Sequence, residues 1–200
     1  MDALPSLREF SRQAVGAALE KQADLPDLLV VDGTAGNGHD ALFLARTLAR
    51  LSPSFRLLAF DLQEAALAAT RSRLAAAGLD GYLQCLAHGH ETLARHLGAE
   101  RIAAAMFNLG FLPRSDRALV TKAATTLAAL EAALSALRPR GILSVHAYGG
   151  HPGGREELAA VEDWFSALPA SRATAARYAL CNKPRNPEVL FLAQPAEGPS

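Results

Sequence analysis

Acidic residues flank a glycine-rich turn in the stretch "VVDGTAGNGHD", which runs from Val30 to Asp40. Asp32 ends an apolar run, and the glycines follow it directly. Glycine allows backbone to approach a ligand closely and to adopt positive φ, and a helix that begins after such a turn presents free N–H groups. The stretch therefore predicts a loop that binds a small ligand, and an ordinary tight turn is the alternative.

The kind of ligand follows from the residues around this turn. No Gly-Lys-Ser/Thr follows it and its spacing is not Gly-x-Gly-x-x-Gly, so it is neither a P-loop nor a dinucleotide fingerprint. Asp32 disfavours a phosphate and favours a ligand with an amino group or a positive charge. Asp61 ends a second apolar run, "RLLAFD", where an acid can accept both hydroxyls of a ribose. A ligand with a ribose, a cationic amino-acid tail and no phosphate is S-adenosylmethionine, which these acids favour.

A second motif, "FNLGFLP", covers residues 107–113. N-methyltransferases use an Asn followed by a turn and an aromatic residue to hold an amine, because the Asn carbonyl and a nearby backbone carbonyl accept its N–H groups. Asn108 would then hold the amine, and Phe111 could stack on a flat base. The alternative is that Asn108 caps a turn and Phe111 belongs to the core.

A third motif, "HAYGGHPGG", covers residues 146–154. His151 or Tyr148 could accept a proton from the nucleophile or hydrogen-bond the substrate, whereas His146 favours a structural role. His88 and His90 are two residues apart, but a metal site would need a closer cluster of ligands. We therefore predict no metal.

Strands and helices that alternate along the chain must position these motifs. After a leading amphipathic helix at 6–22, strands are expected at 28–32, 56–61, 82–87, 102–108 and 142–148, the last after a turn that starts at 138. Helices are expected between or after them at 40–51, 63–78, 121–137 and 155–168. Two closing strands, at 173–180 and 188–193, are joined by a segment short enough for a hairpin. The pattern predicts a doubly wound, mostly parallel α/β sheet in which the hairpin makes one edge strand antiparallel.

Composition bounds the domain and its setting. The 200 residues suit one domain, with a leading helix at 1–27, a core at 28–194 and a frayed tail at 195–200. Equal numbers of acidic and basic residues exclude a large nonspecific phosphate footprint, which leaves a small structured RNA or a small molecule as substrate. With two cysteines, no signal peptide and no apolar run that could span a bilayer, we expect a cytoplasmic protein.

Three segments, "DGTAGNGHDALFLA", "NLGFLPRSDRALVTKAATT" and "YGGHPGGREELAAVEDW", together resemble the rRNA methylase family with its YtqB- and MnmM-like members. The resemblance covers about residues 28–192. It implies a class I S-adenosylmethionine-dependent methyltransferase with a Rossmann-like seven-stranded sheet. It also implies N-methylation of the aminomethyl group on the wobble uridine of tRNA, often on 2-thiouridine. The implied partner is the anticodon region of tRNA, with no membrane, and a homodimer stays open.

The resemblance also assigns residues by position. The catalytic set that it implies is Asn108, Phe111, Tyr148 and His151. The cofactor-binding set is Asp32, Ala35, Gly36, Asn37, Gly38, Asp40, Asp61, Leu62, His90 and Asn108. The substrate-binding set is Leu109, Gly110, Leu112, Pro113, Arg114, Lys183 and Arg185, of which the basic residues would contact anticodon-stem phosphates together with Arg117 and Lys122.

The chain departs from the family pattern in places. Gly33 stands where the family more often has alanine, a change that we expect the turn to tolerate. Gly89 replaces a commoner serine, which removes one hydrogen bond to the donor. An rRNA or small-molecule amine methyltransferase is the alternative enzyme, and a non-catalytic RNA-binding module is the alternative from another class.

Overall fold

The computed structural model describes residues 4–52, 54–110, 121–182 and 187–196. Its strands are β1 (Leu28–Asp32), β2 (Phe55–Phe60), β3 (Leu83–Leu86), β4 (Ile102–Leu109), β5 (Leu137–Tyr148), β6 (Ala173–Ala179) and β7 (Glu188–Pro195). Its α-helices are α1 (Leu7–Glu20), α2 (His39–Leu51), α3 (Glu64–Ala75), α4 (Leu93–Leu97), α5 (Ala123–Ala136) and α6 (Gly154–Ser166). Short 3₁₀ helices lie at Asp80–Tyr82 and His90–Thr92.

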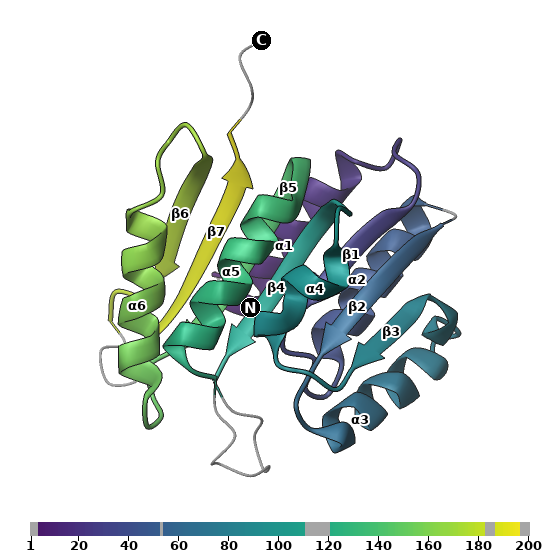
Figure 1. The fold of residues 1–200 in the computed structure, drawn as a ribbon, viewed down its shortest axis with the longest axis horizontal. Coiled ribbons are helices and arrows are strands. Elements are labelled where there is room, and N and C mark those ends of the chain that lie inside the picture. The colour runs from purple at the N-terminus through teal and green to yellow at the C-terminus, as the bar shows by residue number, and fades with distance from the viewer. Residues whose placement is uncertain (1–3, 53, 111–120, 183–186, 197–200) are drawn as a thin grey trace.

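The strands form one seven-stranded sheet in the order β3-β2-β1-β4-β5-β7-β6 (Figure 1). β1 to β5 pair in parallel, and the strand order reverses between β1 and β4. This confirms the predicted Rossmann-like α/β fold. In such sheets a ligand binds outside the carboxyl ends of the strands, next to the point where the order reverses.

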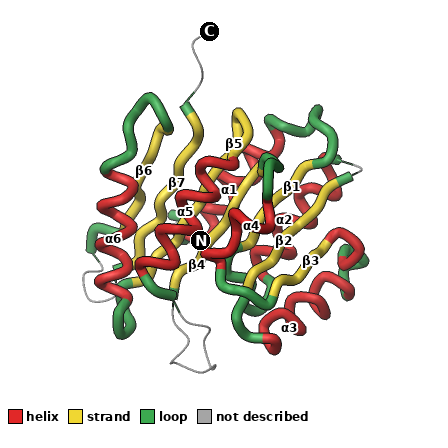
Figure 2. The backbone as a smooth tube through the Cα atoms, viewed as in Figure 1, coloured by secondary structure: helices red, strands yellow, loops and turns green. Residues whose placement is uncertain are grey.

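Helices cover both faces of the sheet (Figures 1 and 2). Apolar side chains of α1, α2 and α3 pack on one face, and those of α4, α5 and α6 pack on the other. All the residues of β1 are buried, as expected for a parallel strand covered on both sides. Of the helices in the described residues, none is both long enough and apolar enough to pass through a membrane.

The closing hairpin is arranged differently from the prediction. The hairpin is antiparallel as predicted, but β7, which runs antiparallel to both β5 and β6, takes the interior place and β6 takes the edge. The sequences of the two strands explain this order. β7 contains the apolar run Val189–Phe191, which is buried, whereas much of β6 is exposed. The more apolar strand therefore takes the interior position, where both of its faces are covered.

Two other local features were not predicted. α4 has only five residues, too few to show a helical period. The turn expected from residue 138 lies inside β5, which already begins at Leu137. β5 is irregular at this point. Arg140 has a φ of 66°, and the pairing of β5 with β4 shifts register between Ile102 and Ala104.

Candidate functional site

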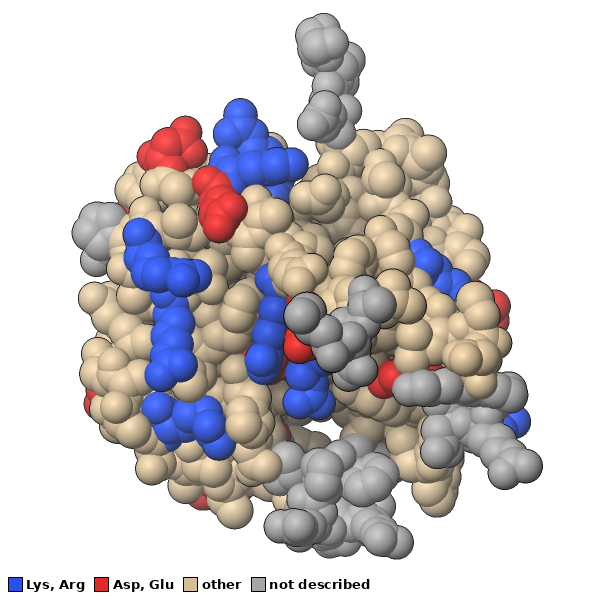
Figure 3. Space-filling model, turned by 180° about the vertical axis from the view of Figure 1, so that it is seen from behind, with Lys and Arg blue, Asp and Glu red and all other residues tan. Residues whose placement is uncertain are grey.

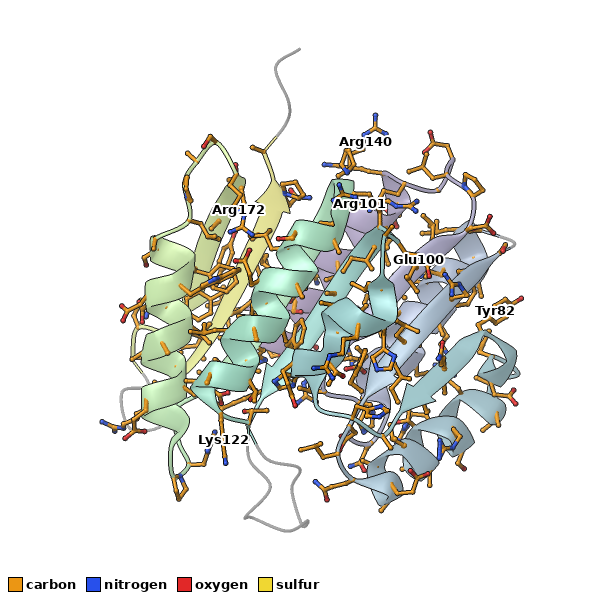
Figure 4. The ribbon with its side chains drawn as sticks, in the orientation of Figure 1. Tyr82, Glu100, Arg101, Lys122, Arg140 and Arg172 are labelled. Carbon is orange, nitrogen blue, oxygen red and sulfur yellow. The ribbon has the colours of Figure 1, made fainter. Side chains whose placement is uncertain are left out.

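The three sequence motifs meet at the carboxyl edge of the sheet. Asp32 is the last residue of β1, Asn108 lies one residue before the end of β4, and Tyr148 ends β5. β1 and β4 are neighbours, with Asp32 in register with Met106, so the first two motifs flank the point where the strand order reverses. Figure 4 shows Lys122 at this same edge, at the start of α5.

The glycine-rich loop folds back across the first two strands. The Ala35 N–H donates to the Phe60 carbonyl at 2.8 Å, which ties the loop to the end of β2. Gly36 and Gly38 have φ values of 50° and 73°, a region that favours glycine. Gly38 caps α2, and a Cβ at that position would lie 2.8 Å from Thr70 Cα. Gly38 is therefore required both by its backbone conformation and by the packing of α3.

Asp32 carries an incompletely satisfied charge beneath this loop. Its side chain is fully buried, and Oδ1 accepts the Thr34 N–H at 3.1 Å. Oδ2 is buried and has no hydrogen-bond partner among the described residues. Burial, followed by the nearby charge of Asp40, raises the pKa of Asp32 to about 7. A cationic group bound at the loop would stabilise the charged carboxylate, as the amino-acid end of S-adenosylmethionine requires.

Asp61 connects the loop to the next strand end. Its Oδ2 accepts the Gly36 N–H and its Oδ1 accepts the Gln63 N–H, both at 2.9 Å. Each carboxylate oxygen keeps a second lone pair that a ribose hydroxyl can use. Leu62 beside it is 62% exposed, which is unusual for a large apolar side chain and leaves a surface for a flat ring. The residues present therefore fit S-adenosylmethionine.

Asn108 is held by the loop from two directions. Its N–H donates to Thr34 Oγ1 at 2.7 Å, and its Nδ2 donates to Asp40 Oδ2 at 2.5 Å. Asp40 Oδ1 accepts from Arg12, at 2.8 Å from Nε and 2.6 Å from Nη2. The resemblance placed Asp40 among donor-binding residues, which stays a prediction. The contact with Arg12 of α1 was not predicted, because 28 residues separate the partners.

The third motif lies against Gly110, the residue that follows β4. A Cβ on Gly110 would be 3.4 Å from His151 Nε2 and 3.9 Å from Tyr148 Cδ2. His151 Nδ1 donates to the Pro152 carbonyl at 3.0 Å. Because a carbonyl only accepts, Nδ1 carries a proton in this contact. The structure thus brings the predicted substrate turn and His151 together.

Tyr148 belongs to a chain of polar groups that runs from α1 to β7. The Tyr148 hydroxyl is 2.9 Å from His146 Nδ1, and the positive charge of Arg8 in α1 acts on it. Which of the two groups donates in this contact depends on the tautomer of His146. His146 Nε2 lies 3.4 Å from Glu188 Oε2. Burial raises the pKa of Tyr148 and lowers that of His146, so both stay neutral near pH 7.

Some predicted residues cannot be placed. Those that lie outside the described residues are Phe111, Leu112, Pro113, Arg114, Arg117, Lys183 and Arg185. Ala35 is buried under the loop, Asn37 is exposed, and Leu109 is buried at the end of β4. Among the residues that the structure describes, no group of three or more His, Cys, Asp or Glu side chains is arranged to hold a metal ion.

Beneath the site lies a buried network that sequence reasoning missed. Glu157 of α6 is 3% exposed, and its carboxylate accepts the hydroxyls of Thr121 at 2.5 Å and Thr126 at 2.6 Å. Thr121 Oγ1 in turn accepts the Gly110 N–H at 3.0 Å. His90 lies 3.5 Å from Thr126, and burial lowers its pKa. The network joins the predicted donor side at His90 to the substrate turn at Gly110.

The two departures from the family pattern have local packing explanations. A Cβ on Gly33 would lie 2.1 Å from the Phe107 ring, which is buried, so in this chain the packing of Phe107 favours glycine at this place in the turn. A Cβ on Gly89 would lie 2.2 Å from the end of the Glu91 side chain. A serine at position 89 would require the Glu91 side chain to move, whereas glycine leaves room for Glu91 in its present position.

Comparison with known proteins shows the family of the chain. A family model described as "Putative rRNA methylase" matches residues 57–194. A curated Arabidopsis thaliana relative, "tRNA (mnm(5)s(2)U34)-methyltransferase, chloroplastic", is 35% identical over 172 residues, or 82% of this chain. The chain spans 62% of that relative's length.

Solved structures resemble the chain over nearly its whole length. A "putative methyltransferase" from Streptococcus mutans, in complex with SAH, has a TM-score of 0.80 and 30% identity, covering 96% of this chain and 99% of that one. An rRNA methylase from Streptococcus thermophilus has a TM-score of 0.76 and 30% identity, covering 97% and 99%.

Proposed function

The chain belongs to the rRNA methylase family, and on that premise we propose that it uses S-adenosylmethionine to methylate the aminomethyl group on the wobble uridine of tRNA. Methyl transfer to RNA is supported by the family match. The Streptococcus mutans neighbour supports the donor, because SAH is what remains when S-adenosylmethionine has given up its methyl group. The wobble position is supported by the name of the Arabidopsis relative.

The position of Asn108 carries the proposal. Its Nδ2 is engaged by Asp40, which leaves Oδ1 as the end of the amide that can accept a hydrogen bond. An amine nitrogen whose N–H is held by Oδ1 keeps its lone pair for bond formation. Asn108 lies directly beside the donor loop, through Thr34, so the amine and the donor would be held next to each other.

The donor would be bound by the residues that fit it. Asp32 would hold the cationic amino-acid end, Asp61 the ribose hydroxyls, and Leu62 one face of the base. When bound, S-adenosylmethionine supplies a methyl group on a positively charged sulfur. The loop residues contribute by holding that group in place, because alignment of the reactants provides most of the acceleration for a good leaving group.

His151 is the proton acceptor in this proposal. A primary alkylamine is largely protonated at neutral pH, since such amines have a pKa of about 10. The His151 ring supports this role by its position, because a Cβ on Gly110 of the substrate motif would be 3.4 Å from His151 Nε2. Tyr148 is less suited to this role, because its hydroxyl is engaged with His146 Nδ1 at 2.9 Å and burial raises the pKa of Tyr148.

The test is methylation of defined RNA substrates. We would incubate the protein with S-adenosylmethionine bearing a deuterated methyl group and with tRNA that carries aminomethyluridine at the wobble position. Mass spectrometry of the digested nucleosides should show one labelled methyl group on that nucleoside. The same tRNA without the aminomethyl group is the matched control, and Asn108→Ala should reduce labelling at least about tenfold.

Other outcomes separate the competing functions. Labelling of ribosomal RNA or of a small amine, with none on the tRNA, would replace the proposed substrate by that one. Calorimetry with S-adenosylmethionine addresses the other class: an absence of binding would indicate a non-catalytic RNA-binding module.

A further inference from the structure

We propose that Arg12 and Asp40 are positioning residues for methyl transfer, because together they fix which end of the Asn108 amide is presented to the amine. This inference rests on the proposed function of Asn108. It gives α1 a part in the reaction, although α1 lies outside the region matched by the family model, residues 57–194.

Each oxygen of the Asp40 carboxylate has its own partner. Oδ1 accepts two hydrogen bonds from the Arg12 guanidinium, at 2.8 Å and 2.6 Å, and Oδ2 accepts one from Asn108 at 2.5 Å. Asp40 is 6% exposed, so water competes little with these bonds. Arg12 also donates to the His39 carbonyl at 3.2 Å, which anchors it to the start of α2. The three side chains therefore form one continuous chain of hydrogen bonds.

The charge of Asp40 decides the orientation of the amide. The two ends of an Asn side chain have nearly the same shape but opposite hydrogen-bonding character. A carboxylate only accepts, so it pairs with Nδ2 of Asn108 and would repel Oδ1 at the same distance. Arg12 occupies Oδ1 of Asp40 and thereby keeps Oδ2 turned toward Asn108. The carbonyl end of Asn108 is then the end left for a substrate N–H.

Neighbouring residues fix the two ends of the Arg12–Asp40–Asn108 hydrogen-bond chain. Thr34 accepts the Asn108 N–H at 2.7 Å, so the donor loop fixes the backbone of Asn108 as well as its side chain. α1 is anchored at its start by a capping box between Ser6 and Glu9. Its buried Ser11 lies 2.7 Å from Ser144 of β5, which fixes the helix on the sheet one residue before Arg12.

The experiment compares Arg12→Met, Arg12→Lys and Asp40→Asn with the wild-type protein. We expect kcat for tRNA methylation to fall at least about tenfold in Arg12→Met and Asp40→Asn, equal to about 1.4 kcal/mol in the barrier. KM for tRNA and the Kd for SAH should stay within about twofold, because the amide is misoriented while the binding surfaces persist. Arg12→Lys should recover part of kcat, since it keeps the charge but loses the paired donors.

A spectroscopic readout tests the contact without activity. Hydrogen exchange at the Asn108 side-chain amide, followed by NMR, should be slow in the wild-type protein and at least about tenfold faster in Asp40→Asn. Arg172→Met is the matched control, because it breaks a similar arginine–carboxylate pair, with Glu131, at the opposite end of the sheet (Figure 4). It should leave both kcat and this exchange unchanged.

Three results are decisive. Wild-type kcat in folded Arg12→Met and Asp40→Asn would overturn the inference. Loss of SAH affinity in step with kcat would also overturn it, because Asp40 would then be a donor-binding residue, as the resemblance implies. If the wild-type protein methylates no RNA, the proposed function fails, yet the exchange measurement still shows whether Asp40 orients the amide.

Discussion

At the scale of single residues, Asp32 combines a negative charge with complete burial. Its folded pKa of about 7 lies above the ordinary value of 3.8, so the charged form costs stability in the protein without its ligand. This cost is fully present above pH 7 and disappears as the pH falls toward 3.8. The residue best suited to bind a cationic group is therefore one that destabilises the free protein.

We predict that Asp32→Asn stabilises the ligand-free protein at pH 8 by about 1–4 kcal/mol. The gain should shrink at pH 5, where wild-type Asp32 already carries a proton in the folded state. Urea unfolding at the two pH values measures this difference, and calorimetry should show weaker binding of S-adenosylmethionine. If Asp32→Asn changed the free energy of unfolding equally at both pH values, the charge of the Asp32 carboxylate would not be the cause of the lower stability.

Gly33 gives a second prediction at this scale. In Gly33→Ala the new methyl group would lie 2.1 Å from the Phe107 ring, which is buried, so the ring or the loop would have to shift. We expect a loss of about 1–3 kcal/mol in the free energy of unfolding. Gly81→Ala is the matched control, because a Cβ there has no neighbour within 4 Å, and it should change stability by less than about 0.5 kcal/mol.

Residues at strand ends could be predicted from sequence, and their long-range partners could not. Asp32, Asp61 and Asn108 each follow or end an apolar run, so local pattern placed them at one edge of the sheet. Arg12 sits on an amphipathic helix whose docking position has no local signal. Arg12 becomes part of the site because α1 packs against α2. No spacing in the sequence indicates that packing.

At the scale of elements, α6 is joined to the substrate turn by the buried carboxylate of Glu157. We predict that Glu157→Ala costs about 2–4 kcal/mol, because the hydroxyls of Thr121 and Thr126 lose a charged acceptor in a buried place. The exposed neighbour Glu156 provides the control, and Glu156→Ala should change stability by less than about 0.5 kcal/mol. Chemical denaturation measures both, and similar losses would mean that the network contributes nothing.

Element order shows the limit of periodicity as a guide. Alternation of apolar runs located nearly every strand and helix, because each element carries its own period. The hairpin was recognised too, but its two strands were not assigned to interior and edge. That choice depends on which strand has more apolar surface to cover, and β7 with its buried Val189–Phe191 run has more than β6.

At the scale of the whole molecule, a formal net charge of zero makes the placement of each cation important. Figure 3 shows several Lys and Arg side chains on the face opposite to that of Figure 1, so the charges are not evenly mixed. Lys122 is exposed at the carboxyl edge, whereas Arg101 and Arg140 lie at the other end (Figure 4). An RNA bound at the site would meet Lys122 and not the other two.

We therefore predict that Lys122→Gln weakens tRNA binding by about two- to fivefold at low salt and reduces the salt-dependence slope by about one unit. Arg101→Gln is the control and should leave both unchanged, because Arg101 bonds the carbonyl of Ser135 away from the site. Fluorescence titration over a range of salt concentrations measures both quantities. Equal losses of tRNA affinity in the two variants would mean that the RNA does not bind at the carboxyl edge of the sheet.

The interior position of β7 also bears on how the chain reaches its folded state. β6 precedes β7 in the sequence but pairs with no other strand in the described sheet, and one edge of β5 also depends on β7. Before β7 is in place, β6 and that edge of β5 would therefore have unpaired backbone groups. Strand edges of this kind invite pairing between chains. Pairing of residues 188–195 is therefore the step that removes both of these strand edges.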